Sequence, residues 1–513
     1  MAPPLIVRNL TPTLIVLRSV ETFEDPFTKQ SKPTAFPANS NGATTVAPTA
    51  GKLGAHAQTF HHQDLDVSLA PFESYTLNTR NAAASETDAS ELSSTTLRLV
   101  VQNPGGERFR VEMNPSYTQK ASRNFTPLTP NPSTSFTALY HPAKPLAHLT
   151  VHANHLHNYP RWMESLPPEL PLSALSIPGT HNAHTHYRAL PSVRCQIHSV
   201  KTQLENGIRF LDIRVQPAHA TDASKKELLL VHGAFPVSLT GIKYFGPVLD
   251  ACYKFLDENP SEVILISLKR EGVGSSTDEH LAEILQRHYI TPNQKRWHVE
   301  SAIPYLGDVR GKLVLIRRYD IPETNSEPQD CGLDATAWPH NSTHALHGPF
   351  CVQDWCEVLH PSSIPTKLQH SNDHLIRSAS CTAFIPGINT DKANPVPPGP
   401  VYLNFLTGNN FWRTGTWPDK IAKVVNRGIE EWVCIGHHLE EPLVAPSEPD
   451  RTSVEGGSKG REVRKRAESG DGGTGVVVMD MVGENGDWDL VGLIVGMNMG
   501  VLLKINEAQE YLS

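Results

Sequence analysis

The 513-residue chain lacks several features that would place it in familiar classes of protein. Its seven cysteines are scattered and include no CxxC pair, which argues against a disulfide framework and against a zinc cage. There is no run of about 18 apolar residues, so no transmembrane segment is expected. The stretch 1–9 lacks the basic start and long apolar core of a signal peptide. These absences favour a cytoplasmic location and leave peripheral contact with membranes open.

The chain also lacks the excess of basic residues that attracts nucleic acid. It carries 45 basic and 53 acidic residues and a net charge of −8, so we expect no nucleic-acid partner and no general attraction to anionic lipid. Any contact with a membrane surface must therefore be local. No motif indicates a protein partner or an oligomeric state. The length alone allows roughly two to four domains.

Residues 1–150 have the pattern of an all-β domain with long polar loops. Runs typical of strands occur at 14–17, 97–101, 109–113 and 149–151. Stretches rich in Pro, Ser, Thr, Asn and Ala separate them, notably 25–63 and 80–95. Because no helical pattern lies between these strands, we expect a small sandwich-like antiparallel domain. We find no catalytic group of residues in it.

The remainder, 155–513, has the rhythm of an α/β domain. Most of its strand candidates are continuous apolar runs, typical of parallel strands that are covered on both faces. The eight candidates are 175–177, 210–213, 228–231, 263–266, 313–316, 350–352, 401–405 and 476–479. Helical patterns lie between several of them, so we expect a distorted (β/α)8 TIM barrel, irregular at the short polar gap 216–227. The stretch 445–474 is expected to be a flexible insert.

Polar and charged side chains follow most of these strands. They are His181 and Asn182, Asp212 and Arg214, His232, Lys269 and Arg270, Arg317 and Arg318, Asp354, and Asp480. Taken singly, each has an ordinary structural explanation as a solvated or ion-paired residue. In a barrel, however, all of them would lie at the carboxyl-terminal mouth, where reactive groups are found. So many charges are costly to bury unless they are paired or used.

The first three of these strands carry residue types suited to phosphodiester chemistry. One histidine, His181 or His232, can accept a proton from an attacking hydroxyl, and the other can donate one to the leaving oxygen. Arg214 can hold the phosphate between them. The combination is far more specific than any of its members.

The motifs around these residues resemble the X domain of phosphatidylinositol-specific phospholipase C. The resemblance is carried by SIPGTH at 176–181, FLDIR at 210–214, VHG at 231–233 and ILISLK at 264–269. VQD at 352–354 and VMD at 478–480 resemble later motifs of the bacterial-type enzymes. The resemblance covers 165–435 and 475–495. It implies a phosphoric diester hydrolase that acts on a phosphatidylinositol-type phospholipid at a membrane surface.

The resemblance also implies roles for individual residues. His181 would be the general base for the inositol 2-hydroxyl, with Asp480 orienting it. Arg214 would stabilise the phosphate, His232 would be the general acid, and Asp212 would hold Arg214 or His232 in place. The residues expected to bind the substrate are Asn182, Lys269, Arg317 and Asp354.

The expected reaction needs no cofactor, with Ca²⁺ as the alternative. Bacterial-type members usually have Asp where this chain has Asn182, so the resemblance predicts weaker support for the general acid. Eukaryotic members use Asn at that position as a calcium ligand, together with carboxylates, one of them at the position of Arg214. Because an arginine and a calcium ion do the same electrostatic work, Arg214 favours a metal-independent site.

Two rival functions stay open. One is a catalytically weak or inactive barrel that binds lipid or acts as a scaffold, and the other is a phosphodiesterase for a different head group. The aromatic residues Trp355, Phe411, Trp412 and Trp417 follow the sixth and seventh strands. They either reach into a lipid interface or pack under the loops.

Overall fold

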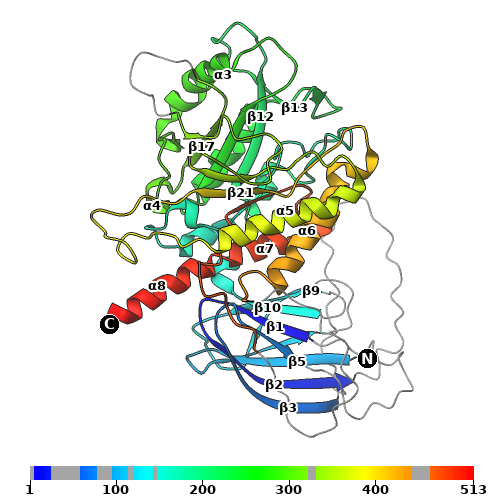
Figure 1. Ribbon diagram of the computed structural model, residues 1–513, viewed down its shortest axis with the longest axis vertical. Coiled ribbons are helices and arrows are strands. Elements are labelled where there is room, and N and C mark those ends of the chain that lie inside the picture. Colours follow the sequence, from blue (N-terminus) through cyan, green and yellow to red (C-terminus); the bar gives the residue numbers. More distant parts are fainter. Residues whose placement is uncertain are drawn as a thin grey trace. The chain divides into compact units, whose positions relative to one another are not determined.

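The computed structural model describes residues 5–24, 58–77, 95–113, 121–141, 147–321, 331–440 and 463–512. The chain divides into two units (Figure 1). The first comprises Met1–His155 with Glu431–Glu468, and the second comprises Leu156–Glu430 with Ser469–Ser513. The grouping of 431–468 with the first unit differs from the expected assignment of this stretch to the second. The part of the expected insert at 445–462 lies outside the described residues.

The described elements between Leu5 and Ala153 are ten strands in two five-stranded sheets. One sheet has the order β4 (Ser74–Leu77), β1 (Leu5–Leu10), β10 (Ala147–Ala153), β9 (Phe136–His141) and β7 (Ala121–Asn124). The other has the order β3 (Gln58–Leu69), β2 (Ile15–Glu24), β5 (Thr95–Gln102), β6 (Arg108–Met113) and β8 (Thr126–Pro127). All pairings are antiparallel except β1 with β10.

The alternation seen in the sequence explains this unit's core. In β6 the residues Phe109, Val111 and Met113 are buried, while the residues between them are not. They join Leu97, Leu99 and other apolar residues in one hydrophobic cluster. Several strands were not anticipated, among them β1, β4 and β9. β3 could not be predicted because it begins inside the polar stretch 25–63 and is itself mostly polar.

The second unit is mixed α/β and is built on a largely parallel sheet. Its strand order is β16 (Trp297–His298), β17 (Leu313–Arg318), β15 (Ile264–Arg270), β12 (Phe210–Pro217), β11 (Ile177–Thr180), β22 (Val476–Met479), β21 (Val401–Phe405), β20 (Phe350–Gln353) and β19 (Ala345–His347). All neighbours along this path are parallel except the terminal pair β19 and β20. A short strand, β18 (Leu333–Asp334), pairs with β17. The central strands are buried, as their continuous apolar runs predict.

The third strand candidate departs from the expected parallel pattern. β13 (Leu228–His232) pairs antiparallel with β12, with Val215 opposite Leu230, and continues into β14 (Phe235–Pro236). The connection 218–227 is too short for the crossover that parallel strands require, so the chain returns as a hairpin. His232 therefore approaches the carboxyl-terminal end of the sheet from a strand that runs the opposite way.

Helices connect most of the strands of this unit, and two further helices follow its last strand, β22 (Figure 1). They are α1 (Val200–Glu205), α2 (Phe245–Glu258), α3 (Asp278–Ile284), α4 (Leu306–Val309), α5 (Ile364–Ala379), α6 (Pro418–Ile435), α7 (Asp489–Gly496) and α8 (Met499–Leu512). The stretch Asp489–Glu510 is long and apolar enough to cross a membrane by length and composition, which the sequence analysis did not anticipate. However, 78% of its apolar window is buried inside the protein, so packing accounts for its composition.

Candidate active site

His181 lies just beyond β11 on a turn that its neighbours make possible. Gly179 pairs with Phe210 of β12, and a Cβ at Gly179 would lie 2.9 Å from the Cβ of Phe210, so only glycine permits this approach. Asn182 has a φ of 43°, a left-handed conformation that Asn adopts more readily than most residues. The turn places His181 at the carboxyl-terminal end of the parallel strands.

His181 and Asp480 form a histidine–carboxylate pair. Asp480 follows β22, the parallel neighbour of β11, and its Oδ1 lies 2.9 Å from Nδ1 of His181. On the opposite side of the ring, Arg214 Nη2 and Asn182 Nδ2 each lie 3.1 Å from Nε2. Because a guanidinium can only donate, Nε2 is the acceptor and the ring proton lies on Nδ1. His181 therefore presents the lone pair of a base on Nε2.

Asp480 also governs the proton affinity of this base. Burial alone lowers the pKa of His181, but the charge of Asp480, together with the neighbouring Cys195, more than offsets burial and raises it. We expect Asp480→Asn to lower the pKa of His181, because the imidazolium loses its nearby opposite charge. An NMR titration of the imidazole measures the shift. Asp334→Asn is the control, since Asp334 pairs with Arg317 instead, and an unchanged His181 titration in Asp480→Asn would contradict this role.

Asp212 is fully buried and pairs with two arginines. Its Oδ2 accepts from Nη2 of Arg214 at 3.3 Å and from the backbone N–H of Asn182 at 3.2 Å, while Oδ1 accepts from Nη1 of Arg318 at 3.4 Å. Burial alone would raise the pKa of Asp212, but Arg214 and Arg318 hold it well below its usual range. The carboxylate stays charged and keeps both guanidinium groups in place.

Arg214 is shared between two carboxylates. Besides its contacts with Asp212, its Nη1 donates to Oε1 of Glu271 at 2.9 Å. Oε2 of Glu271 accepts from the backbone N–H of Gly233 at 3.0 Å, which ties Arg214 to the residue after His232. Arg214 thus lies in a network that joins the His181 turn to the β13 hairpin.

The register of the parallel strands β12, β15 and β17 determines which cationic side chains lie in this network. Arg214 pairs with Lys269 of β15, and Lys269 pairs with Arg318 of β17, so the three form one row across parallel strands. Successive residues of a strand point to opposite faces, which turns Arg317 away from the row. Arg317 instead donates to the carbonyl of Tyr319 at 2.9 Å. Arg318, rather than the predicted Arg317, therefore lies with the cluster.

His232 faces the pair from the hairpin. Its ring centroid lies 6.2 Å from that of His181. Its Nδ1 donates to the carbonyl of Val193 at 2.8 Å, which leaves Nε2 to carry a transferable proton. Burial alone lowers the pKa of His232, but the neighbouring Cys195 raises it overall. Bacterial-type relatives usually have Asp at the position of Asn182, where it would support the general acid. In this chain the hydrogen-bond partner of His232 is the backbone carbonyl of Val193 instead.

The other two predicted residues lie at the same edge of the sheet. Asn182 is buried and contacts both His181 and Asp212. Asp354 follows β20 and is half-buried, and its charge is among those that raise the pKa of Arg214. Every predicted site residue except Arg317 therefore lies in the cluster or acts on it electrostatically.

Sequence reasoning missed Cys195 and Glu271. The Sγ of Cys195 lies 3.7 Å from Nδ2 of Asn182 and 3.9 Å from Nδ1 of His232. It also lies within 4.8 Å of a ring nitrogen of His181, so this buried side chain adjoins both histidines. It lies in the stretch between β11 and α1, where no pattern points to a site. Glu271 directly follows Lys269 and Arg270, and its position after a strand was an available signal.

The four aromatic residues that follow β20 and β21 differ in exposure. Trp412 is 87% exposed. Phe411 stacks on Phe235 with ring centroids 4.1 Å apart, and the indole N–H of Trp417 donates to the carbonyl of Phe411 at 3.0 Å. Trp355 packs edge-on against the ring of His370. Three of the four are therefore packed, and Trp412 projects into solvent.

Comparison with known proteins gives a family for this arrangement. Residues 169–319 match the family model described as phosphatidylinositol-specific phospholipase C, X domain. The 1-phosphatidylinositol phosphodiesterase of Listeria monocytogenes is 34% identical over 167 residues, which are 30% of this chain and 48% of that protein. The human PI-PLC X domain-containing protein 1 is 27% identical over 157 residues, which are 24% of this chain and 46% of that protein.

The chain spans about half the length of these curated relatives. A crystal structure of a phosphatidylinositol-specific phospholipase C from Staphylococcus aureus overlaps 66% of this chain and 98% of its own, with a TM-score of 0.48 and 20% identity. The residues matched by the family model include His181, Asp212, Arg214 and His232. Residues 169–319 of this chain are thus similar to the X domain of the phosphatidylinositol-specific phospholipase C family.

Proposed function

We propose that this protein is a phosphoric diester hydrolase of the phospholipase C type, acting on a phosphatidylinositol-type lipid at a membrane surface. The observation that carries the proposal is the base-like Nε2 of His181, with Arg214 beside it and His232 across from it. The names of the curated relatives support phosphatidylinositol as the substrate class. The cytoplasmic face of a membrane is the proposed place of action.

We further infer that the parallel sheet of the second unit is a distorted (β/α)8 barrel. The path from β17 through β11 and β22 to β20 supplies seven parallel strands, and the β13 hairpin takes the place of the remaining one. We also infer that the two sheets of the first unit form a sandwich around their shared apolar cluster.

The proposed reaction is an intramolecular displacement at phosphorus. Nε2 of His181 takes the proton of the inositol 2-hydroxyl, whose oxygen bonds to phosphorus as the bond from phosphorus to the diacylglycerol oxygen breaks. His232 gives its proton to that leaving oxygen, and the product is a cyclic inositol phosphodiester. Because the nucleophile belongs to the substrate, proximity supplies much of the acceleration. Arg214 stabilises the charge that develops on the phosphate.

The proposed reaction uses no metal ion, and the ion pairs around Asp212 support this. Both oxygens of Asp212 accept from arginines, and Glu271 accepts from Arg214. A calcium ion needs six to eight oxygen ligands and would have to displace these guanidinium groups. The positive charge that a metal would supply is already provided by Arg214, Lys269 and Arg318. Lys269, Arg318 and Asp354 are the proposed head-group contacts.

The test is release of water-soluble inositol phosphate from phosphatidylinositol vesicles by the full chain, beside phosphatidylcholine vesicles. We expect release from the first lipid alone. Vesicle binding without release from any lipid would instead support the lipid-binding or scaffold function. Release from another head group but not from phosphatidylinositol would overturn the substrate class and keep the reaction type.

We expect Trp412→Ala to weaken binding to phosphatidylinositol vesicles by about 10-fold, because the variant lacks the largely exposed indole that would be buried in lipid. The same substitution should leave turnover of a water-soluble inositol phosphodiester unchanged. Leu346→Ala, which removes a residue that is 71% exposed on β19, is the matched control. An equal loss on the soluble substrate would show that Trp412 acts through the fold rather than through the membrane.

A further inference from the structure

A second cluster of reactive side chains lies away from the histidine site, at the edge of the parallel sheet. It consists of His344, Cys351 and His374. In the antiparallel pair of β19 and β20, Cys351 lies opposite Leu346, so His344, two residues earlier, shares the face of Cys351. His374 comes from α5, and the ligand atoms of all three residues lie within 4.8 Å of one another.

The geometry of the cluster is close to that of a metal site. The Sγ of Cys351 lies 3.5 Å from Nδ1 of His344. In a tetrahedral zinc site, bond lengths of about 2.3 Å to sulfur and about 2.0–2.1 Å to nitrogen place those two ligand atoms about 3.5 Å apart. A pair of histidines with one cysteine is also a donor set that zinc accepts.

His374 supplies an independent observation that points to a ligand. Its side chain is fully buried, and neither of its ring nitrogens makes a hydrogen bond of good geometry among the described residues, although the backbone of Cys351 lies close enough to act on the ring. Buried polar groups in proteins are nearly always satisfied, so an unmatched imidazole requires an explanation.

Cys351 is a thiol in the absence of a metal. Burial raises the pKa of Cys351 to about 11, although the positive charge of Arg377 acts to lower it. A bound metal would displace the thiol proton, as it does at other cysteine ligands. Arg377 would stabilise the resulting thiolate and would also repel the cation, so the affinity should be below that of an all-cysteine site.

We propose that His344, Cys351 and His374 form a binding site for a zinc-like divalent cation, which ties the edge hairpin of β19 and β20 to α5. The three residues leave a fourth position, and His344 is exposed, so an ion can enter from solvent and keep a water ligand. The site is separate from the proposed phosphodiesterase chemistry, and its test does not depend on that activity.

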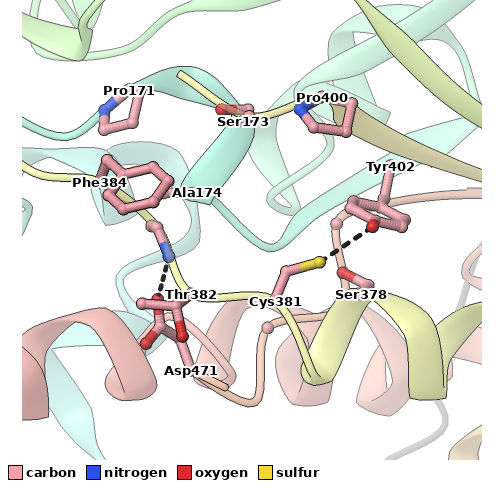
Figure 2. Close-up of a pocket in the computed structure, with 14 residues that line it drawn as sticks. Pro171, Ser173, Ala174, Ser378, Cys381, Thr382, Phe384, Pro400, Tyr402 and Asp471 are labelled. Atoms are coloured by element: carbon pink, nitrogen blue, oxygen red, sulfur yellow. Dashed lines mark hydrogen bonds between the residues drawn. The ribbon is translucent and has the colours of Figure 1, made fainter. Parts of the chain in front are cut away.

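A neighbouring thiol provides a matched control. Cys381 lines a cavity of about 230 Å³ with Ser378, Phe384 and Asp471, and its Sγ lies 2.9 Å from the hydroxyl of Tyr402. Figure 2 shows this hydrogen bond among the residues that line the cavity, just after the carboxyl-terminal end of α5. Cys381 lies outside the three-residue cluster, so Cys381→Ser removes a nearby thiol without removing a proposed ligand.

The experiment is a cobalt(II) titration of chelator-stripped full chain, followed by displacement with zinc. It is run in a Cys195→Ser background, because Cys195, His181 and Asp480 form another group of possible ligands. We expect one cobalt ion per chain, a thiolate-to-cobalt absorption band, and its loss when zinc is added. Cys351→Ser should abolish the band, and Cys381→Ser should keep it.

His344→Ala guards against misfolding as an explanation, because His344 is an exposed residue. It should weaken cobalt binding by at least about 10-fold while leaving the circular dichroism spectrum unchanged. Absence of the band, persistence of the band in Cys351→Ser, or its loss in Cys381→Ser would each overturn the site.

Discussion

Alanine at His181 or at His232 is expected to lower kcat on phosphatidylinositol vesicles by roughly 10²–10⁴-fold, the usual contribution of general acid–base catalysis. His181 presents an acceptor Nε2 held by Asp480, and His232 has a free Nε2 because Nδ1 donates to the carbonyl of Val193. His181 therefore has the tautomer of a base, and His232 can donate from Nε2 as the imidazolium, which its raised pKa favours. Initial rates of inositol phosphate release measure the loss.

A variant with alanine at both His181 and His232 tests whether the two histidines act together or independently. If the two histidines act in one proton-transfer step, His181→Ala with His232→Ala should cost little more than the worse single variant. His219→Ala removes an exposed histidine from the same unit and should leave the rate unchanged. Full activity in either single active-site variant would contradict the assignment of base and acid.

Arg214→Ala is expected to lower kcat by roughly 10²–10³-fold, and a chelator is expected to leave the wild-type rate unchanged. The first effect follows because a fixed cation beside the phosphate is worth about as much as an oxyanion-hole donor. The second follows because Asp212 and Glu271 are occupied by arginines. Rates with and without EDTA for both proteins measure the two effects together.

Arg287→Ala is the control for loss of an arginine, because Arg287 is exposed and pairs with the exposed Glu283 on the surface. Arg214→Lys should recover part of the rate, since it keeps the charge and loses the bidentate geometry. Loss of wild-type turnover in EDTA, restored by added calcium, would contradict metal independence and return Ca²⁺ to the mechanism.

The parallel strands could be predicted because each is a continuous apolar run that ends in a polar residue. The direction of one predicted strand could not. The run 228–231 is as apolar as 263–266, yet it returns as a hairpin. Only the short polar connection 218–227 indicated an irregularity there. Apolar composition reports burial on both faces, whereas strand direction depends on the length of the connection.

The site residues could be predicted as a set, but the face of the sheet to which each side chain points could not. Arg317 and Arg318 both end β17, and the sequence does not indicate which of them lies in the site. The pairing of Lys269 with Arg318 brings Arg318 to Asp212. Cys195 reaches the histidines through tertiary packing of a long connection, which no local pattern encodes. The cluster of His344, Cys351 and His374 was likewise invisible, because three elements contribute to it with no metal-binding spacing.

The most direct test is ³¹P NMR of wild-type protein with phosphatidylinositol vesicles in the presence of EDTA. A base at His181, an acid at His232 and Arg214 in place of a metal predict a five-membered cyclic inositol phosphodiester as the first phosphorus product, with diacylglycerol left in the membrane. Phosphorus that stays in the lipid, or that appears as phosphatidic acid, would contradict that mechanism.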